Sequence, residues 1–217
     1  MLNRISEIGS EFWIKEYPKT PLIERDGVYV LSGRTAIDLV VQNIQKYKAI
    51  EHVYMPAWCC DSMLAPFVKR NFKIEFYDIA FDSRIEYKID ASSHTDIFYL
   101  TNYFGYESMV PMDLIHKLKE NGCIILYDRT HSFLMDDIKY RQIADYSFAS
   151  IRKWMGIVSG AIVDGIDELI LKDFPYVIDK AEAMYNKYRY MCGDDSISKD
   201  EFRGAFEKFG HYLAADY

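Results

Sequence analysis

Short β-rich runs alternate with helical patterns along most of this 217-residue chain, and this alternation constrains the fold more than any other feature. Apolar residues recur at helical spacing after Ser32-Gly33, which predicts a helix from about Arg34 to Lys48. The run His52–Met55 then predicts a strand that ends at Pro56. Because strands that alternate with helices typically form a parallel sheet, the chain is expected to have an α/β fold.

The remaining expected elements continue this alternation. Helices are expected at residues 61–70, where Pro66 either kinks the helix or lies in its first turn, and at residues 111–120, which end before Gly122. The polar segment that leads to His94 favours neither helix nor strand. Further strands are expected at residues 73–78, 96–101, 123–127, 145–149 and 161–163.

Beyond Gly165 the strands cease, and two helical stretches finish the chain. The last begins with the capping pattern Ser198-x-x-Glu201. One face of this helix carries Phe202, Phe206, Phe209 and Leu213. We expect this apolar face either to cover the sheet or to belong to the stem of a further domain.

The charge balance argues against nucleic acid as a partner. Lys and Arg number 26 against 33 Asp and Glu, a net charge of −7, whereas proteins that grip phosphate backbones are basic. No apolar stretch approaches the roughly 20 residues of a membrane span, and the first ten residues lack the pattern of a signal peptide. We therefore expect a cytoplasmic protein with no membrane partner.

The four cysteines, Cys59, Cys60, Cys123 and Cys192, show neither the spacing of a disulfide framework nor that of a zinc site. We expect reduced thiols, and the plain explanation of the adjacent pair is that it fills core space. Aromatic residues make up 16% of the chain, with 18 Tyr and 13 Phe, and we expect most of them in the core.

Polar residues follow several expected strands, and ligands of open α/β sheets gather at the carboxyl ends of strands. The sequence Ser32-Gly33-Arg34-Thr35 presents backbone N–H groups at a helix amino terminus, which can bind an anion such as phosphate. Taken alone, these four residues are better explained as an ordinary capped helix. The other candidates are residues 56–60, Asn102-Tyr103, Asp128 with His131, and residues 150–153.

Asp128 directly follows an apolar strand and His131 lies three residues on, so both can point into one crevice. An Asp that caps the next turn and a His bound to backbone explain the pair equally well. A metal site is less favoured, because no second His or carboxylate stands at ligand spacing. Lys153 leaves a later strand and can serve as a nucleophilic amine, although a solvated surface lysine is the usual alternative.

Together these sites resemble the fold-type I pyridoxal-phosphate enzymes, and within them the sugar-aminotransferase-like DegT/DnrJ/EryC1 family. The resemblance implies a three-layer α-β-α sandwich with a mostly parallel sheet, the large cofactor-binding domain of such a transferase, plus carboxyl-terminal helices. It rests on five motifs in the family's order: LSGRTAIDLV (31–40), VYMPAWCC (53–60), LTNYFGY (100–106), ILYDRTHS (125–132) and SFASIRKWMGIVSGAIV (147–163).

The resemblance implies a binding site for pyridoxal 5'-phosphate. Gly33, Arg34 and Thr35 match the turn that holds the cofactor phosphate, and Ser150 matches a further phosphate ligand. Asp128 matches the acid that pairs with the pyridinium nitrogen.

Three further positions complete the implied site. His131 matches the group that hydrogen-bonds near the phenolic oxygen of the cofactor. Lys153 matches the catalytic lysine that forms a Schiff base with the cofactor and then shuttles a proton. Asn102 and Tyr103 match a segment that borders the substrate side.

The chain departs from the family pattern in two places. In the family, an aromatic residue stacks on the cofactor ring, and here Cys60 stands at its position. Either the Cys60 thiol covers the ring, Trp58 covers it, or cofactor binding is weakened. Family members also continue into a carboxyl-terminal domain that helps to close the active site. We therefore expect residues 1–165 to form the cofactor-binding domain and residues 166–217 to be a helical extension, the stem of an absent small domain.

The implied function is that of a pyridoxal-phosphate-dependent aminotransferase, or its cofactor-binding domain, acting through Lys153. It moves an amino group from an amino-acid donor such as glutamate to a keto acceptor, with a nucleotide-linked sugar as one candidate. A homodimer is expected, because sites in this family are completed across a dimer. Arg34, Arg129 and Arg152 can each pair with a donor carboxylate, and the sequence selects none.

Two other functions stay open. The first is a truncated, non-catalytic chain that keeps the fold and acts as a binding partner or relic, in which a donor would not convert the bound cofactor to its aminated form. The second is a mononucleotide-binding domain that uses Gly33, but the glycine-rich signatures of such domains are missing.

Overall fold

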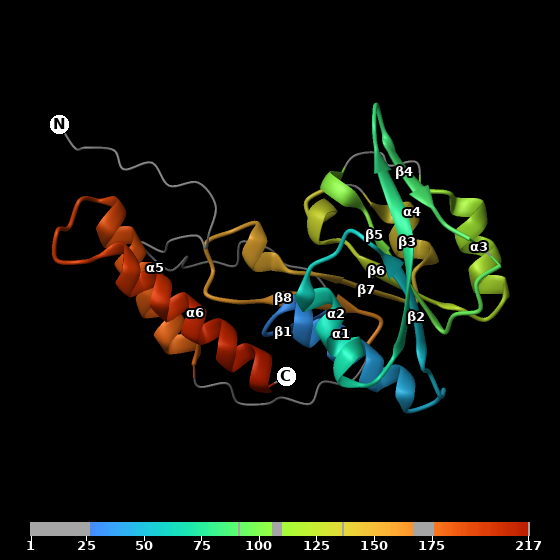
Figure 1. The fold of residues 1–217 in the computed structure, drawn as a ribbon, viewed down its shortest axis with the longest axis horizontal. Coiled ribbons are helices and arrows are strands. Elements are labelled where there is room, and N and C mark those ends of the chain that lie inside the picture. Colours follow the sequence, from blue (N-terminus) through green and yellow to red (C-terminus); the bar gives the residue numbers. More distant parts are fainter. Residues whose placement is uncertain (1–26, 91, 106–109, 136, 167–175, 217) are drawn as a thin grey trace. The chain divides into compact units, whose positions relative to one another are not determined.

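The computed structural model describes residues 27–90, 92–105, 110–135, 137–166 and 176–216. Some sequence expectations concern residues outside these ranges, namely the first ten residues, Tyr106 and Tyr217. The described residues fall into two compact units (Figure 1). The larger comprises residues 27–150 and 161–166 and holds the sheet, and the smaller comprises residues 151–160 and 176–216.

In the larger unit, eight strands of the described chain form one sheet in the order β1-β8-β7-β6-β5-β2-β3-β4. The four pairs from β7 to β3 are parallel, whereas β1, β8 and β4 pair antiparallel at the two edges. An α/β fold with a mostly parallel sheet is thereby confirmed. The strands are β1 (Val28–Val30), β2 (His52–Pro56), β3 (Lys73–Phe81), β4 (Ile85–Lys88), β5 (Ile97–Thr101), β6 (Ile124–Asp128), β7 (Tyr146–Ala149) and β8 (Ala161–Asp164).

Helices cover both faces of this sheet. Helices α1 (Gly33–Gln45) and α2 (Asp61–Lys69) pack on one face, and α3 (Met112–Glu120) and α4 (Ile138–Ile143) pack on the other. Successive strand residues point to opposite faces, so Tyr99 of β5 joins the apolar cluster under α1. The larger unit is therefore the expected three-layer α-β-α sandwich.

Several elements differ from the sequence expectations. Strand β3 runs to Phe81 and pairs with β4, in the polar segment that was expected to favour no element. Strand β1 and the short helix α4 were also not expected. Pro66 lies inside α2, beyond its first turn, and is buried beside Phe67.

The smaller unit contains the two expected carboxyl-terminal helices, α5 (Val177–Met191) and α6 (Lys199–Asp216), which pack side by side (Figure 1). Aromatic rings of Tyr190 and Phe202 lie 5.4 Å apart between them. The expected capping box forms: the Ser198 N–H donates to the Glu201 carboxylate (2.7 Å), and the Glu201 N–H donates to the Ser198 hydroxyl (3.2 Å).

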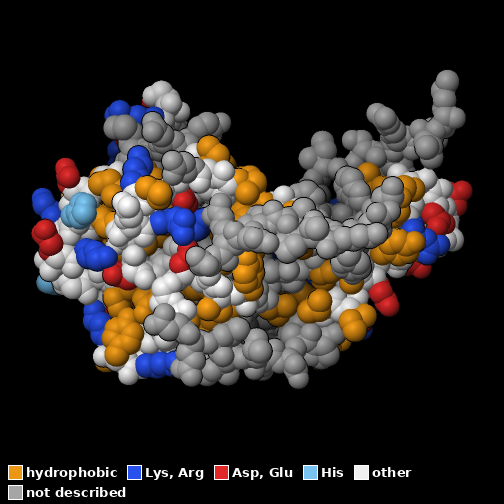
Figure 2. Space-filling model, turned by 180° about the vertical axis from the view of Figure 1, so that it is seen from behind, with side chains coloured by type: hydrophobic (Ala, Val, Ile, Leu, Met, Phe, Trp, Pro, Cys, Tyr) orange, Lys and Arg blue, Asp and Glu red, His pale blue; other side chains and the backbone are white. Residues whose placement is uncertain are grey.

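None of the described helices is long and apolar enough to cross a bilayer. On the face that Figure 2 shows, positive and negative side chains of the described residues are interspersed rather than separated by sign.

Candidate active site at the carboxyl edge of the sheet

The carboxyl ends of β5, β6 and β7 meet the amino terminus of α1 on one face of the sheet. Asp128 is the last residue of β6, and it stands in register with Thr101 of β5 and with Phe148 of β7. Ser150 follows β7 by one residue, and Gly33 begins α1. This is the edge where the sequence predicts a ligand site.

Gly33 faces Ser150 across a small space, which we call the cradle. A Cβ atom on Gly33 would lie 3.4 Å from the Ser150 Cβ and 3.5 Å from the Phe148 ring, so a larger residue would fill this space at van der Waals contact whereas glycine leaves it open. The Ser32 hydroxyl caps α1 by accepting the Thr35 N–H at 3.1 Å. The first turn of a helix presents N–H groups that make no intrahelical hydrogen bond, and such groups can bind an anion at the cradle.

Asp128 is buried, and both of its carboxylate oxygens accept hydrogen bonds. The Tyr99 hydroxyl donates to Oδ2 (2.8 Å), and the Thr130 backbone N–H donates to Oδ1 (2.9 Å). Burial, helped by the adjacent Asp128 charge, raises the pKa of Tyr99 well above its usual value, so Tyr99 remains a donor. The carboxylate is held in one orientation, and its remaining lone pairs can accept from a protonated ring nitrogen.

Thr130 links Asp128 to the cradle. It lies in the 3₁₀ turn η2 (Thr130–Ser132), and its hydroxyl accepts the Ser150 N–H at 3.1 Å. The same residue therefore fixes both Asp128 and Ser150, and it is buried.

His131 belongs to the same turn and packs against aromatic residues. Its Nδ1 accepts the N–H of Phe104, a residue of η1 (Tyr103–Gly105), at 3.3 Å, and the two rings stack at 5.6 Å. Because Nδ1 acts as an acceptor, we assign the proton of a neutral ring to Nε2, which can then donate to a ligand.

Trp58 and Cys60 follow β2. The Trp58 ring packs against Phe81 (4.4 Å) and Phe104 (5.9 Å), and its carbonyl accepts the Tyr103 hydroxyl at 2.5 Å. Half of Trp58 stays exposed, so the cluster presents an aromatic surface to solvent. The exposed Cys60 thiol lies 3.0 Å from the Ser62 hydroxyl.

Asn102 is not gathered with Asp128, and Lys153 belongs to the other unit. Asn102 is buried and hydrogen-bonds Tyr127, which faces the other side of the sheet under α3 and α4. Lys153 ends η3 (Ile151–Lys153) in the smaller unit, where its side chain is exposed. Arg34, in the first turn of α1, is partly buried.

Arg129, a candidate partner for a donor carboxylate, is held in the core. Its guanidinium lies 3.1 Å from Asp164 and 3.4 Å from Asp137, and 5.6 Å above the Phe133 ring. Only 1% of the Arg129 side chain is exposed. This buried cation bridges two carboxylates and ties the end of β8 to the start of α4, so it serves the packing of the core rather than a ligand at the edge.

Sequence reasoning missed three residues of this edge: Tyr99, Thr130 and Thr101. Tyr99 reads as an ordinary core residue of a strand. The spacing Asp128-x-Thr130 is a signal that could have been used, because an Asp often accepts the N–H two residues on. Thr101 is buried, and among the described residues its hydroxyl has no hydrogen-bond partner.

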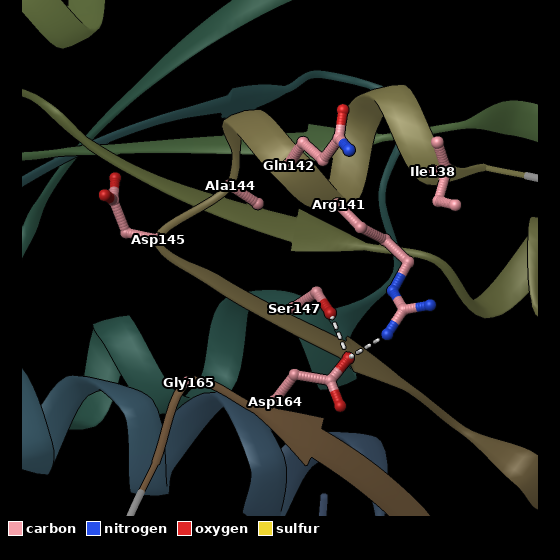
Figure 3. Close-up of a pocket in the computed structure, with 8 residues that line it drawn as sticks. All are labelled: Ile138, Arg141, Gln142, Ala144, Asp145, Ser147, Asp164 and Gly165. Atoms are coloured by element: carbon pink, nitrogen blue, oxygen red, sulfur yellow. Dashed lines mark hydrogen bonds and ion pairs between the residues drawn. The ribbon is translucent and has the colours of Figure 1, made fainter. Parts of the chain in front are cut away.

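A separate pocket of about 420 Å³ opens at the opposite, amino-terminal edge of β7 (Figure 3). Its charged groups are already paired: Asp164 accepts the Ser147 hydroxyl (2.6 Å) and lies 3.7 Å from Arg141. Asp145 accepts the Ile125 N–H and pairs with Lys119. The pocket holds none of the expected site residues, and no chemistry is assigned to it. Within the described part of the chain, no three His, Cys, Asp or Glu side chains gather as they would around a metal.

Comparison with known proteins places the fold. No protein-family model matches this sequence, and no curated protein matches it. Among solved structures, NtdA from Bacillus subtilis with its bound cofactor PMP matches 76% of this chain at 15% identity and a TM-score of 0.53. Two further matches are 3-amino-5-hydroxybenzoic acid synthase (17% identity, 75% of this chain, TM-score 0.49) and the ureidoglycine-glyoxylate aminotransferase of Bacillus subtilis (10%, 77%, 0.48).

The matched region spans less than half of each of these structures: 36% of NtdA, 42% of the synthase and 46% of the aminotransferase. At these identities the likeness concerns the fold. This chain therefore shares the fold of the matched part of NtdA, in agreement with the architecture that its motifs imply.

Proposed function

We propose that this chain is a pyridoxal-phosphate-dependent aminotransferase, or the cofactor-binding domain of one. It transfers an amino group from an amino-acid donor to a keto acceptor. The observation that carries the proposal is the placement of an anion cradle and a fixed buried acid on one face of one sheet edge. The fold shared with NtdA, a protein with bound PMP, supports it.

The residues at this edge fit pyridoxal phosphate on two counts. The space that a Cβ on Gly33 would fill is left open beside Ser150, where a phosphate can approach the first turn of α1. Asp128, the second feature, offers a buried and oriented carboxylate for the ring nitrogen. When bound, the cofactor supplies an electron sink for the negative charge that develops on the substrate carbon.

Each gathered residue then has a task. Backbone N–H groups at Gly33 and Arg34, with the hydroxyls of Thr35 and Ser150, bind the phosphate. The Ser150 N–H is already donated to Thr130, so Ser150 offers its hydroxyl. Asp128 accepts the N–H of the cofactor ring and keeps that proton in place.

His131 hydrogen-bonds near the phenolic oxygen of the cofactor. Of the two candidates for covering the ring, Trp58 offers the larger stacking surface, because Phe81 and Phe104 brace its indole. Tyr103, whose hydroxyl donates to the Trp58 carbonyl, borders the substrate side.

Lys153 is the proposed catalytic amine. Its amine would hold the cofactor covalently and would move the proton at the substrate carbon. The lysine stands three residues after Ser150 in the sequence, as in the family that the motifs resemble. The partners that this assignment implies are a small amino donor, a keto acceptor such as a nucleotide-linked sugar, and a second copy of the chain in a homodimer.

The proposal is tested by mixing the purified protein with pyridoxal phosphate, reducing the mixture with borohydride and mapping the modified peptide by mass spectrometry. We expect one adduct, on Lys153, which is lost in Lys153→Ala and kept in Lys73→Ala, a change at an exposed lysine of β3. An adduct spread over many lysines would overturn the proposal. A single Lys153 adduct, together with an unreduced cofactor-bound protein whose spectrum does not respond to amino donors, would instead favour the non-catalytic binding protein.

A further inference from the structure

The Thr101 hydroxyl is a buried polar group for which the described residues provide no hydrogen-bond partner. Thr101 is 3% exposed, and within the described part of the chain its Oγ1 has no hydrogen-bond partner. Its backbone carbonyl, by contrast, accepts the Tyr87 hydroxyl at 2.8 Å. Buried hydroxyls are nearly always hydrogen-bonded in folded proteins, so one with no partner among the described residues is a candidate to bond a ligand.

The position of Thr101 indicates what that partner is. Thr101 and Asp128 are in register at the ends of two parallel strands. Asp128 accepts a hydrogen bond from Tyr99, which belongs to the cluster under α1, and Thr101 lies two residues beyond Tyr99 in the same strand. Because strand side chains alternate, Thr101 and Asp128 face the same side of the sheet.

The strand order sets the sequence of groups along this edge. Strand β7 with the Gly33–Ser150 cradle comes first, then β6 with Asp128, then β5 with Thr101. A ligand that places an anionic group in the cradle and a ring nitrogen on Asp128 therefore has Thr101 on the far side of its ring. On pyridoxal phosphate, the phenolic oxygen is the polar ring substituent that can meet a hydroxyl there.

We propose that Thr101 is a cofactor-binding residue that donates its hydroxyl hydrogen bond to the phenolic oxygen of pyridoxal phosphate. This inference rests on the proposed function of the same edge. It adds a second donor beside His131, and one phenolic oxygen has lone pairs for both. It also explains why a threonine whose hydroxyl has no partner among the described residues stands at this register position.

The test compares Thr101→Val, which removes the hydroxyl at nearly constant shape, with Thr101→Ser, which keeps it. Pyridoxal phosphate binding is titrated by absorbance, and unfolding by urea is measured without the cofactor. We expect Thr101→Val to weaken binding about 10-fold, the effect of one hydrogen bond, and to leave the cofactor-free protein at least as stable. Thr101→Ser should bind like the wild type.

Thr95→Val is the matched control. Thr95 lies just before the same strand, at its opposite end, and its hydroxyl is satisfied by the carbonyls of Ile97 (3.0 Å) and His52 (3.3 Å). This change should lower stability and leave cofactor binding unaltered. If the wild type binds and Thr101→Val binds equally well, the inference falls and the proposed function stands. If the wild type fails to bind pyridoxal phosphate, the proposed function falls and this inference with it.

Discussion

At the residue scale, one threonine holds together the two halves of the candidate site. Thr130 donates its N–H to Asp128 and accepts the Ser150 N–H with its hydroxyl. The backbone bond to Asp128 survives any side-chain change, whereas the bond to Ser150 does not. A substitution at Thr130 can therefore disturb the cradle while both proposed cofactor-binding residues, Asp128 and Ser150, stay in the chain.

We expect Thr130→Val to lower the free energy of unfolding by about 1–3 kcal/mol, because it leaves the Ser150 N–H unpaired in a buried place. The freed Ser150 should also weaken pyridoxal phosphate binding. Thr130→Ser keeps the hydroxyl that accepts the Ser150 N–H, so it should retain most of the stability and most of the affinity for pyridoxal phosphate. Urea denaturation and cofactor titration measure them. Equal stability of wild type and Thr130→Val would show that this hydrogen bond does not organise the edge.

The sequence located Gly33, Asp128 and Ser150 at one edge because parallel strands bring their carboxyl ends together. It could not locate Tyr99 or Thr101, whose roles depend on the register between β5 and β6. Register is a matter of pairing between distant segments, and a local pattern does not contain it. For the same reason the sequence does not predict that Arg129 forms ion pairs with Asp137 and Asp164.

At the element scale, the first turn of α1 is the part of the edge most sensitive to a small change. Ser32 is buried, has extended backbone and caps the helix through the Thr35 N–H. The cap fixes where the helix begins and so where its free N–H groups point.

Replacing Ser32 with Ala should cost about 1 kcal/mol of stability through the lost cap. It should also weaken binding of inorganic phosphate and pyridoxal phosphate, since the first turn of α1 loses its order. Ser32→Asn, which keeps a capping acceptor, should recover the stability. Ser198→Ala removes the corresponding cap of α6 and is the control: stability falls, but phosphate binding stays. Phosphate affinity is measured by calorimetric titration. An affinity of Ser32→Ala equal to that of the wild type would contradict the role of the Ser32 cap in anion binding.

The strong helical and strand patterns of the sequence predicted most elements of the sheet, and the exceptions share a cause. Strand β4 pairs with β3 at the sheet's edge, from Asp78 with Lys88 to Phe81 with Ile85, and its composition is half polar. Strand β1 is three residues long and α4 six, too short for a periodic signal. These elements owe their structure to pairing and packing rather than to local preference.

At the scale of the whole molecule, the larger unit buries an unusual number of tyrosines. Their hydroxyls bond inside the protein: Tyr77 donates to the Tyr99 carbonyl and Tyr87 to the Thr101 carbonyl, both at 2.8 Å. Composition predicted an aromatic core but not this use of the hydroxyls, which again follows from strand register. Burial raises the pKa values of Tyr54, Tyr77, Tyr99, Tyr103 and Tyr127 above their usual value.

These shifts predict a steep loss of stability in alkali. Above about pH 10 the tyrosines of the unfolded chain release protons that the folded chain retains, so the free energy of unfolding falls as pH rises. The stability is fully present below that pH, and each such tyrosine adds a slope of about 1.4 kcal/mol per pH unit above it.

Tyr77→Phe should make this slope of unfolding free energy against pH shallower by about that amount. At pH 8 the same variant should lose only the hydrogen bonds that the Tyr77 hydroxyl makes with the backbone of Tyr99 and Thr101, about 1 kcal/mol each, which provides the internal reference. Urea titrations at intervals between pH 8 and pH 11 measure both quantities. An unchanged slope in Tyr77→Phe would mean that Tyr77 releases its proton equally well in the folded and unfolded states, and that its burial does not control alkaline unfolding.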